Sequence, residues 1–416
     1  MSRRPEIAII GAGAAGCFCG AMLGADASLK RAGARITIYE AGRKPLAKVA
    51  ITGGGRCNLT NSFQDTTVEK AYPRGARMIG RLMAGFSNKD ACDWFTSKGV
   101  ALVTQEDQCV FPKSQKAMQI VNTLLDSLQE GGVRIVTESP VKSIEPSSED
   151  GYTLHFDGKP SIRADVVLVA IGGMATAKMQ ELFQGLDLEI EKPVPSLFTL
   201  KTDSPVRKLA GTVVNPAQAS LQGTKLSAIG PLLITDWGFS GPAILKLSSY
   251  GARVLAEAGY KCTLAINWMQ GSSEEDLRGW LQKAASANPE KQISSVHPER
   301  LTSRLWNFIL NKASIRENIK FAELNPKMAG RLCNTLLCDC YPVTGRARFK
   351  EEFVTCGGIA LGQLNQSTLE CERYPGLYFA GEVMDVDAVT GGFNLQAAWT
   401  TGYTVAMSII RSFQKD

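Results

Sequence analysis

The chain carries a glycine-rich segment near its N-terminus, Gly11–Gly16, with the spacing G-x-G-x-x-G. A short apolar run, Ile7–Ile10, precedes it and predicts a buried strand. This arrangement is typical of a turn that presents a helix N-terminus to a pyrophosphate. A second apolar run ends at Glu40, 24 residues after the last glycine, which is close to the roughly 20 expected for a carboxylate that binds a ribose. A glycine-rich surface turn would explain neither the acid nor the strand, so the sequence predicts a dinucleotide site.

A second glycine-rich segment lies near the C-terminus. The apolar run Leu377–Ala380 predicts a strand, with Gly381 and Glu382 at its carboxyl end, where ligands of doubly wound sheets bind. Gly391–Gly392 then precede a long predicted helix. A glycine pair at a helix N-terminus exposes backbone N–H groups and the positive end of the helix dipole, which suits the anionic ring of a reduced flavin. Glu382 or Asp385 would then bond the ribityl chain; the alternative is that the glycine pair only starts a helix beside a bend.

A third segment suits a flat ligand, because the three successive glycines Gly53–Gly55 let the backbone approach it closely. Arg56 would neutralise a pyrophosphate, and Asn58 would bond a ring edge or a backbone group. Disulfide reductases carry two cysteines five positions apart in a comparable loop. Here only Cys57 is present and the second position is Ser62, which excludes a dithiol relay. Cys57 is therefore either a proton donor beside a flavin ring or a small buried residue that fills space.

Together these segments predict a dinucleotide site and no site for a metal. Their arrangement at the two ends of the chain resembles that of flavoproteins of the glutathione reductase and succinate dehydrogenase type, and the resemblance implies that the dinucleotide is FAD. The predicted catalytic residue is Cys57, as the proton donor. The predicted FAD contacts are Gly11, Gly13, Ala14, Ala15, Gly16, Glu40, Ala41, Gly54, Gly55, Arg56, Asn58, Val141, Gly172, Gly173, Gly381, Glu382, Asp385, Gly392, Phe393, Asn394 and Leu395.

Elements from both ends of the chain must position this site. We expect a helix over 14–32 after the first glycines, and long helical stretches over 76–130. The continuous apolar run Ala164–Ile171 predicts a parallel strand covered on both faces, which ends at the glycine pair of the predicted contacts. From Lys192 onward, prolines and short β-type runs indicate a strand-rich insert. Residues 273–335 have helical spacing.

We therefore predict an α/β fold, with a discontinuous Rossmann-like FAD-binding domain, an inserted β-rich domain and a helical sub-insert. The predicted boundaries are 1–191 and 355–416 for the FAD-binding domain, 192–272 and 336–354 for the β-rich insert, and 273–335 for the helical sub-insert. Ligand sites favour the junctions between such domains.

Composition describes an ordinary globular protein of more than one domain. The chain has 416 residues, of which 44% are hydrophobic and 21% charged, and this length exceeds what a single core serves. No run of about 18 apolar residues occurs, so we expect no membrane span. The N-terminal residues run into a strand rather than an apolar leader, which favours a cytoplasmic location. The net charge of +6 permits a polyanionic partner without requiring one.

The eleven cysteines include no C-x-x-C pair and are accompanied by only two histidines, which indicates reduced thiols rather than a disulfide framework. Cys333, Cys338 and Cys340 lack a fourth cysteine or a histidine at a metal-ligand spacing. We interpret these three residues as buried structural thiols. His155 and His297 are also interpreted as structural.

Four longer segments carry a specific resemblance: Ile51–Asn61, Phe239–Ala243, Gly381–Asp387 and Thr390–Gln396, together with Gly-Arg-Lys at 42–44. They resemble the bacterial YhiN/BaiN-like flavoprotein family over essentially the whole chain. The arrangement as a whole is similar to flavoproteins of the glutathione reductase and succinate dehydrogenase type. The resemblance implies FAD and one of two linked activities: dihydrouridine formation in large-subunit ribosomal RNA, or reduction of conjugated double bonds in bile-acid-type enones. No second G-x-G-x-x-G is present, so NAD(P)H would dock transiently at the flavin as the electron donor.

Both linked activities reduce a C=C bond that is conjugated to a carbonyl. Reduced flavin would deliver hydride from N5 to the β carbon, and a general acid would protonate the α carbon. An ordinary thiol, with a pKa near 8.5, stays mostly protonated at neutral pH. Cys57 and Cys356 therefore both qualify, and we prefer Cys57.

The leading hypothesis is an FAD-dependent oxidoreductase that acts on uridine in ribosomal RNA. One alternative is a reductase or oxidase of a small molecule, such as a steroid-type enone or an amine. Another is a flavin-containing redox sensor or binding protein. RNA would need basic surfaces, and two groups of residues suggest them: Arg74, Arg77 and Arg81 on one predicted helical stretch, and Arg346, Arg348 and Lys350 on one face of a predicted strand. The alternative for each group is an ordinary solvated surface.

Overall fold

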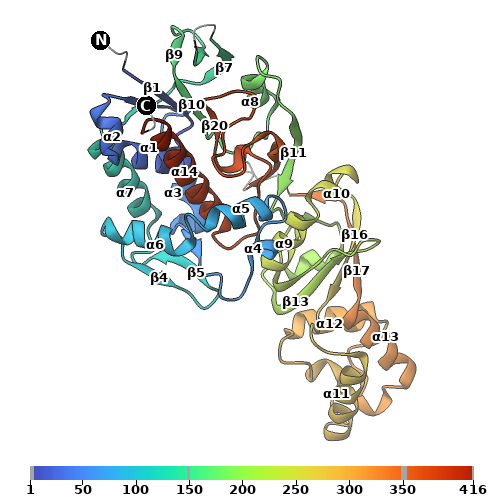
Figure 1. Ribbon diagram of the computed structural model, residues 1–416. Coiled ribbons are helices and arrows are strands. Elements are labelled where there is room, and N and C mark those ends of the chain that lie inside the picture. Colours follow the sequence, from blue (N-terminus) through green and yellow to red (C-terminus); the bar gives the residue numbers. More distant parts are fainter. Residues whose placement is uncertain (1–3, 148–149, 348–353, 415–416) are drawn as a thin grey trace. The chain divides into compact units, whose positions relative to one another are not determined.

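The computed structural model describes residues 4–147, 150–347 and 354–414, and it divides into two compact units (Figure 1). The first unit comprises Met1–Val194 and Val354–Asp416, and the second comprises Pro195–Phe353. The first unit is therefore built from both ends of the chain, whereas the second is one continuous segment.

A five-stranded parallel sheet forms the centre of the first unit. In spatial order its strands are β20 (Leu377–Phe379), β10 (Val166–Val169), β1 (Glu6–Ile10), β2 (Arg35–Tyr39) and β6 (Arg134–Val136). Ile9 on β1 lies between Leu168 and Ile38 on the neighbouring strands, and all three side chains are fully buried. β1 and β10 are covered on both faces, which explains why their residues are apolar without alternation. Because β20 pairs in parallel with β10, the predicted discontinuous Rossmann-like fold is confirmed.

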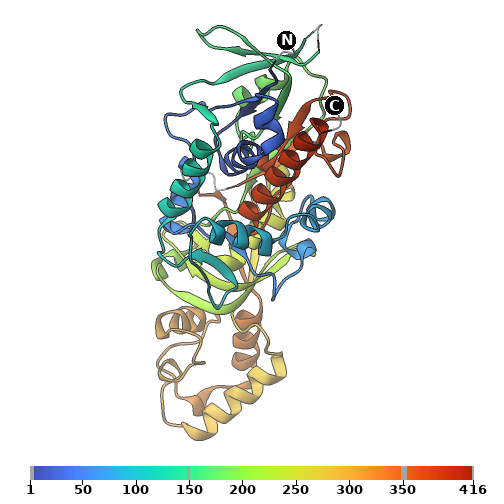
Figure 2. The same cartoon turned by 60° about the vertical axis from the view of Figure 1, so that its left-hand side comes forward.

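The two ends of the chain also meet through helices. α1 (Ala14–Ala25) packs against both α7 (Ala117–Glu130) and α14 (Phe393–Ser412), and α14 lies alongside α1 in both views (Figures 1 and 2). Small residues make this possible. A Cβ at Gly20 would lie 2.9 Å from Leu128 Cδ2, and one at Gly402 would lie 2.8 Å from the carbonyl oxygen of Ala15.

The helix predicted over 14–32 is in fact two helices, so that prediction was wrong in its continuity. α1 ends at Ala25 and α2 (Ala27–Arg31) follows. Asp26 separates them in an extended conformation, and its carboxylate accepts hydrogen bonds from the N–H groups of Ser28 at 2.9 Å and Leu29 at 3.0 Å. Aspartate is a better N-cap than an interior helical residue, because its short side chain satisfies the first free N–H groups.

Smaller elements complete the first unit. Its other sheets are β3 (Thr60–Asn61), β5 (Cys109–Pro112) and β4 (Leu102–Thr104); β7 (Val141–Pro146), β8 (Tyr152–Phe156) and β9 (Ile162–Ala164); and β11 (Ile190–Ser196) with β19 (Val354–Ile359). Its other helices are α3 (Ala47–Gly55), α4 (Val68–Ala71), α5 (Ala76–Met83), α6 (Asn88–Ser97) and α8 (Ala177–Gln180). The prediction of long helical stretches over 76–130 was wrong at β4 and β5. Strands this short contain too few residues for their alternating pattern to be recognised in the sequence.

The second unit contains a seven-stranded sheet. Its order is β17 (Asp339–Val343), β16 (Cys262–Asn267), β13 (Val213–Leu221), β14 (Ser227–Ile234), β15 (Gly238–Ser240), β12 (Leu200–Lys201) and β18 (Gly345–Arg346), and every pair in it is antiparallel. The helices of the unit are α9 (Pro242–Tyr250), α10 (Ala252–Glu257), α11 (Glu274–Ala287), α12 (Ser303–Lys312) and α13 (Pro326–Leu337). α9 packs on β13 and β14.

One continuous hydrophobic core joins this sheet to α11, α12 and α13. Trp268 and Trp306 are its largest fully buried side chains. Each indole N–H has a hydrogen-bond acceptor: Trp268 Nε1 donates to the Asp339 carboxylate at 2.8 Å, and Trp306 Nε1 donates to the Ile293 carbonyl at 2.8 Å. Within the described ranges of both units, no helix has the length and apolar character needed to cross a bilayer.

Replacing Gly16 by Ala should destabilise the first unit. The new Cβ would lie 2.1 Å from the Gly11 carbonyl oxygen, so the turn between β1 and α1 would have to move. Overpacking of this kind costs about 1–3 kcal/mol or more, and urea unfolding measures it. Gly80→Ala is the matched control: Gly80 is exposed on α5 and its nearest new contact is 3.7 Å away, so helix propensity should stabilise that variant by about 1 kcal/mol. Equal unfolding free energies for the two variants would show that the turn tolerates a side chain at Gly16.

Candidate dinucleotide-binding site

The first predicted glycines form a tight turn between β1 and α1. Gly11 has a φ of 103°, and a Cβ there would lie 2.5 Å from the Ala170 carbonyl oxygen, so only glycine fits. α1 begins at Ala14 with Gly13 as its N-cap and without a side-chain cap, and the hydrogen bond from Cys17 N–H to the Gly13 carbonyl measures 3.0 Å. The N–H groups of Ala14, Ala15 and Gly16 come before this first helical hydrogen bond, so the helix has no carbonyl of its own to pair with them. A helix start of this kind is a ready-made site for a pyrophosphate.

Glu40 lies directly beside this turn. One carboxylate oxygen accepts a hydrogen bond from Ala12 N–H at 2.8 Å, and the other accepts one from Gly42 N–H at 2.7 Å. A carboxylate has about four acceptor positions, so these two bonds leave capacity for the hydroxyl groups of a ribose. Ala41, the next predicted contact, is exposed.

The glycine pair after β10 meets the C-terminal strand. A Cβ at Gly173 would lie 2.6 Å from Glu382 Oε1, and that same oxygen accepts a hydrogen bond from Thr355 N–H at 2.7 Å. Gly172 has a φ of 77°, and a Cβ there would lie 3.7 Å from Glu382 Oε2 and 3.9 Å from Lys48 Nζ. The structure therefore brings a carboxylate and an ammonium to this turn. The sequence gives no sign of Lys48, because nothing in its local spacing distinguishes it from a surface lysine.

Gly381, directly after the C-terminal strand β20, lies against the first turn of α1. Its φ is 76°, and a Cβ there would lie 3.1 Å from the Ala15 side chain. Its N–H donates to Thr401 Oγ1 at 3.0 Å. Asp385 follows half-buried, with its N–H donating to the Ile359 carbonyl at 3.0 Å. Predicted contacts from the two ends of the chain are thus neighbours in space.

The segment predicted as a glycine loop is the end of α3 followed by a left-handed turn. Thr52 leaves the helical conformation with φ and ψ of −60° and 148°, and Gly53 and Gly54 are left-handed. Gly54 and Gly55 are exposed, and a Cβ on either would meet no atom within 4 Å. This backbone is therefore open to a ligand.

Arg56 is held against the surface of its own loop. Its guanidinium lies 4.4 Å from the centre of the Phe111 ring, and its Nε donates to the Gly53 carbonyl at 3.1 Å. The side chain is exposed. It carries a positive charge next to the open glycine backbone, where a phosphate would bind favourably.

The segment after the three glycines packs directly against the start of the C-terminal helix. A Cβ at Gly392 would lie 2.4 Å from the Thr60 carbonyl oxygen. Asn61 Nδ2 donates to the Gly391 carbonyl at 3.1 Å, and Thr60 Oγ1 donates to Gln396 Oε1 at 2.6 Å across 336 sequence positions. The Asn58 amide, in the orientation that satisfies both of its groups, accepts from Gly392 N–H at 3.2 Å.

The side chains after Gly392 brace this helix start. Both ends of the Asn394 amide bond the backbone of Ala388, each at 3.0 Å. Phe393 is buried, with its ring centre 5.0 Å from that of Phe63, while Leu395 is half-buried. The amide of Asn394 therefore orders the loop. What the segment offers a ligand is the start of the 20-residue helix α14, where the N–H groups of Phe393, Asn394 and Leu395 precede the first helical hydrogen bond, from Gln396 N–H to the Gly392 carbonyl.

Arg74 has a different place from the one expected. It lies between α4 and α5 rather than on one helix with Arg77 and Arg81, and it forms an ion pair with Asp387. The Asp387 side chain is fully buried and that of Arg74 is 12% exposed. Arg74 is thus a structural residue that holds the loop before Gly391, whereas Arg77 and Arg81 are exposed.

Tyr72 strengthens the same connection, since its hydroxyl donates to the Phe393 carbonyl at 2.7 Å. In the second basic group, the Arg346 guanidinium lies 5.4 Å from the centre of the Tyr260 ring. Arg348 and Lys350 lie outside the described residues.

Both candidate proton donors are buried. Cys57 has a φ of 62° and a fully buried side chain, and burial raises the pKa of its thiol to about 12. Cys356 on β19 is also fully buried. The thiol of Cys57 is thus protonated at neutral pH, and its burial favours the space-filling alternative.

Three predictions concern residues outside this cluster. Val141 begins β7 and pairs with Phe156 on β8. Among the described residues, no group of three or more His, Cys, Asp or Glu side chains is arranged to hold a metal. The interpretation of three buried thiols was wrong for two of them: Cys333 is buried, but Cys338 and Cys340 are exposed, because their positions beside a buried aspartate turn them outward.

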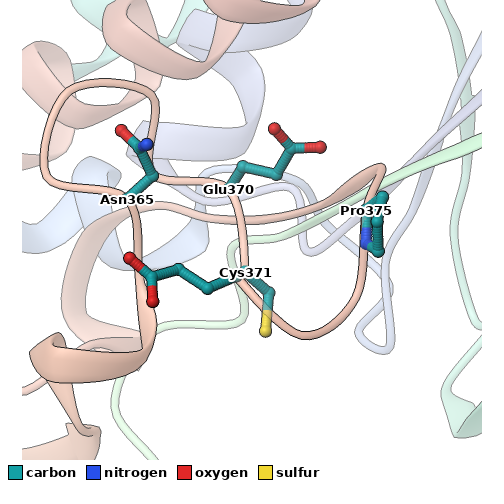
Figure 3. A pocket seen from close by; sticks show the side chains of 5 residues that line it. Asn365, Glu370, Cys371 and Pro375 are labelled. Carbon is teal, nitrogen blue, oxygen red and sulfur yellow. The ribbon is translucent and has the colours of Figure 1, made fainter.

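A hollow on the first unit lies away from these contacts (Figure 3). Its lining comes from the loop Asn365–Pro375 and includes Glu370 and Cys371. Glu370 accepts a hydrogen bond from Gly376 N–H at 2.7 Å, and Asn365 accepts them from the next turn of its own loop. None of the predicted contacts lines this hollow, so it is not the dinucleotide site.

A protein family and individual relatives match nearly the whole length of this chain. A family profile described as "HI0933-like protein Rossmann domain" matches residues 5–408. The ribosomal RNA dihydrouridine synthase of Escherichia coli (strain K12) is 30% identical, with 98% of each chain covered. The 3-dehydro-bile acid delta(4,6)-reductase of Clostridium scindens is 29% identical, covering 96% of this chain and 97% of that protein. A solved 3-ketosteroid-delta4-(5alpha)-dehydrogenase from Rhodococcus jostii is 14% identical, covers 97% of each chain and has a TM-score of 0.48.

Replacing Arg74 by Met should destabilise the first unit and weaken the loop before Gly391. The Asp387 carboxylate would stay buried without its partner, which costs about 3–5 kcal/mol. Urea unfolding measures this loss, and desalting measures how much bound dinucleotide each chain retains. Arg77→Met is the control, because Arg77 is exposed three positions away and its loss should change stability by no more than about 0.5 kcal/mol. If both variants unfold alike, the buried pair is not what holds the loop.

Proposed function

This chain belongs to the HI0933-like Rossmann-domain family and is an FAD-dependent oxidoreductase, and from that premise we propose that it reduces uridine to dihydrouridine in large-subunit ribosomal RNA. We also propose NAD(P)H as the electron donor. In both proposed half-reactions the bound FAD would supply the hydride-transfer chemistry at N5 of its ring.

The observation that carries the proposal is the meeting of three backbone segments in the first unit. The α1 N-terminus would hold the pyrophosphate, and Glu40 would hold the adenosine ribose. The open backbone of Gly54–Gly55 and the N-terminus of α14 at Gly392 would then border the ring. Donors at a helix start favour negative charge on the ring.

Ribosomal RNA is favoured as substrate by the relatives and is compatible with the charge. A ribosomal RNA dihydrouridine synthase matches at 30% identity over nearly the whole chain, and the net charge of +6 permits a polyanionic partner. A uridine would have to leave its stack to reach a buried ring.

Reduction of a small enone is the second candidate, because the bile acid reductase matches almost as well, at 29% identity. A steroid-type enone and the uracil ring both present a C=C bond conjugated to a carbonyl. The residues that bind FAD would serve either substrate, so the choice between them rests on a direct assay.

The first test measures dihydrouridine by mass spectrometry in large-subunit ribosomal RNA from cells with and without this gene. We expect one uridine that carries two extra hydrogens to be lost without the gene and restored by the wild-type chain, but not by Gly16→Ala. If the modification pattern is unchanged, the RNA proposal fails. NAD(P)H consumption in the presence of a steroid enone, with the saturated ketone as control, then tests the second candidate.

We propose Cys57 as the proton donor to test first. If it has this role, Cys57→Ala should slow reduction of the substrate about 10²- to 10⁴-fold while leaving flavin reduction by NAD(P)H unchanged. Because burial raises the pKa of this thiol to about 12, the acid stays protonated, and the wild-type rate should not fall between about pH 7 and pH 10. Equal effects of Cys57→Ala on both half-reactions would assign Cys57 to packing instead. A decline in the wild-type rate centred near the ordinary thiol pKa of about 8.5 would contradict the raised pKa as the property of the proton donor.

A further inference from the structure

Two neighbouring cysteines on the second unit differ from the other nine. Cys338 and Cys340 are exposed, whereas the remaining thiols of the described chain are buried or half-buried. Their sulfur atoms lie 3.9 Å apart. Cys338 caps the end of α13, and Cys340 lies on β17, the edge strand of the seven-stranded sheet. Nothing in the proposed reaction uses them.

The residue between the two thiols fixes their orientation. Asp339 is fully buried, and one of its carboxylate oxygens accepts hydrogen bonds from Trp268 Nε1 and the Tyr341 hydroxyl. Alternate residues of a strand point to opposite faces. Burying Asp339 therefore turns the side chain of Cys340 outward. Cys338 lies directly before the strand, as the C-cap of α13, and its sulfur is 3.9 Å from that of Cys340.

A cation stands beside the pair. Lys312 Nζ forms an ion pair with Asp339 and donates to the Cys340 carbonyl at 2.9 Å. Partial burial and the adjacent Cys338 sulfur raise the pKa of the Cys340 thiol, while the Lys312 ammonium acts in the opposite direction. Both thiols are exposed, so either can be reached by a small molecule; we assign the second, resolving position to Cys340, whose pKa is raised, and the first attack to Cys338.

The pair lacks what a stable metal site needs. Structural zinc takes four ligands, and the described residues place no third His, Cys, Asp or Glu side chain within a metal-binding arrangement here. The two exposed sulfurs lie 3.9 Å apart, and a disulfide bond would bring them to about 2.05 Å.

We propose that Cys338 and Cys340 form a thiol–disulfide exchange site for low-molecular-weight disulfides of the glutathione class. The Cys338 thiolate attacks one sulfur of the small disulfide, forming a mixed disulfide and releasing one small thiol. The Cys340 thiolate then attacks the Cys338 sulfur and releases the second small thiol. Two protein thiols are oxidised to one disulfide, with loss of two electrons and two protons, and the small disulfide is reduced to two thiols.

The test uses the full-length, fully reduced protein. It is incubated with oxidised glutathione, denatured in an alkylating reagent and mapped by peptide mass spectrometry. We expect the peptide with Cys338 and Cys340 to escape alkylation and to lose two hydrogens. Half-buried Cys92 and Cys262 are internal controls and should be alkylated without forming any intramolecular disulfide.

Two variants separate the steps. Cys340→Ser should accumulate a mixed disulfide with glutathione on Cys338, because the resolving thiol is absent, and the double serine variant should take up no glutathione at this peptide. Thermal unfolding checks that all variants fold as the wild type does. Complete alkylation of both thiols in the wild-type protein, or a persistent mixed disulfide with no internal bond, would overturn the proposal.

Discussion

The close approach of two backbones at Gly392 is the constraint on which the rest of the site depends. A Cβ at this position would lie 2.4 Å from the Thr60 carbonyl oxygen, so only a hydrogen atom fits between segments more than 300 residues apart. Glycine allows a similarly close approach at two other places, where Gly381 contacts the Ala15 side chain and where Gly402 contacts the Ala15 carbonyl. Glycine allows α14 and the strand before it to approach the segment after α3 and the start of α1 this closely.

Side-chain contacts hold the loop before α14 in the position that these close backbone approaches require. The buried pair of Arg74 and Asp387, the Tyr72 hydroxyl and the Asn394 amide all bind the loop that precedes α14. These side chains are engaged within the protein and hold the loop in place, so the first N–H groups of α14, those before the bond from Gln396 N–H to the Gly392 carbonyl, are the chemical part of this helix start. A helix start held in this way stabilises charge without reorganising when the charge appears.

The sequence was sufficient for features whose signal is local. The glycine spacing and Glu40 predicted a turn at Gly11–Gly16, and the apolar runs predicted a sheet joined from both chain ends; the fold was confirmed. The pair of Arg74 with Asp387 spans 313 positions, and no periodicity links such residues, so Arg74 was taken for a surface charge. The break at Asp26 was missed because capping depends on where the neighbouring helix stops.

The two-segment construction of the first unit has a consequence for synthesis of the chain. The strand β20 is made after the whole second unit, yet it pairs directly with β10. Until then the edge of β10 presents unpaired N–H and C=O groups, which are a template for association with other chains. The second unit, being continuous, is fully made while the first still waits for its last strand. A ribosome that stalls before Leu377 therefore leaves this edge of β10 unpaired.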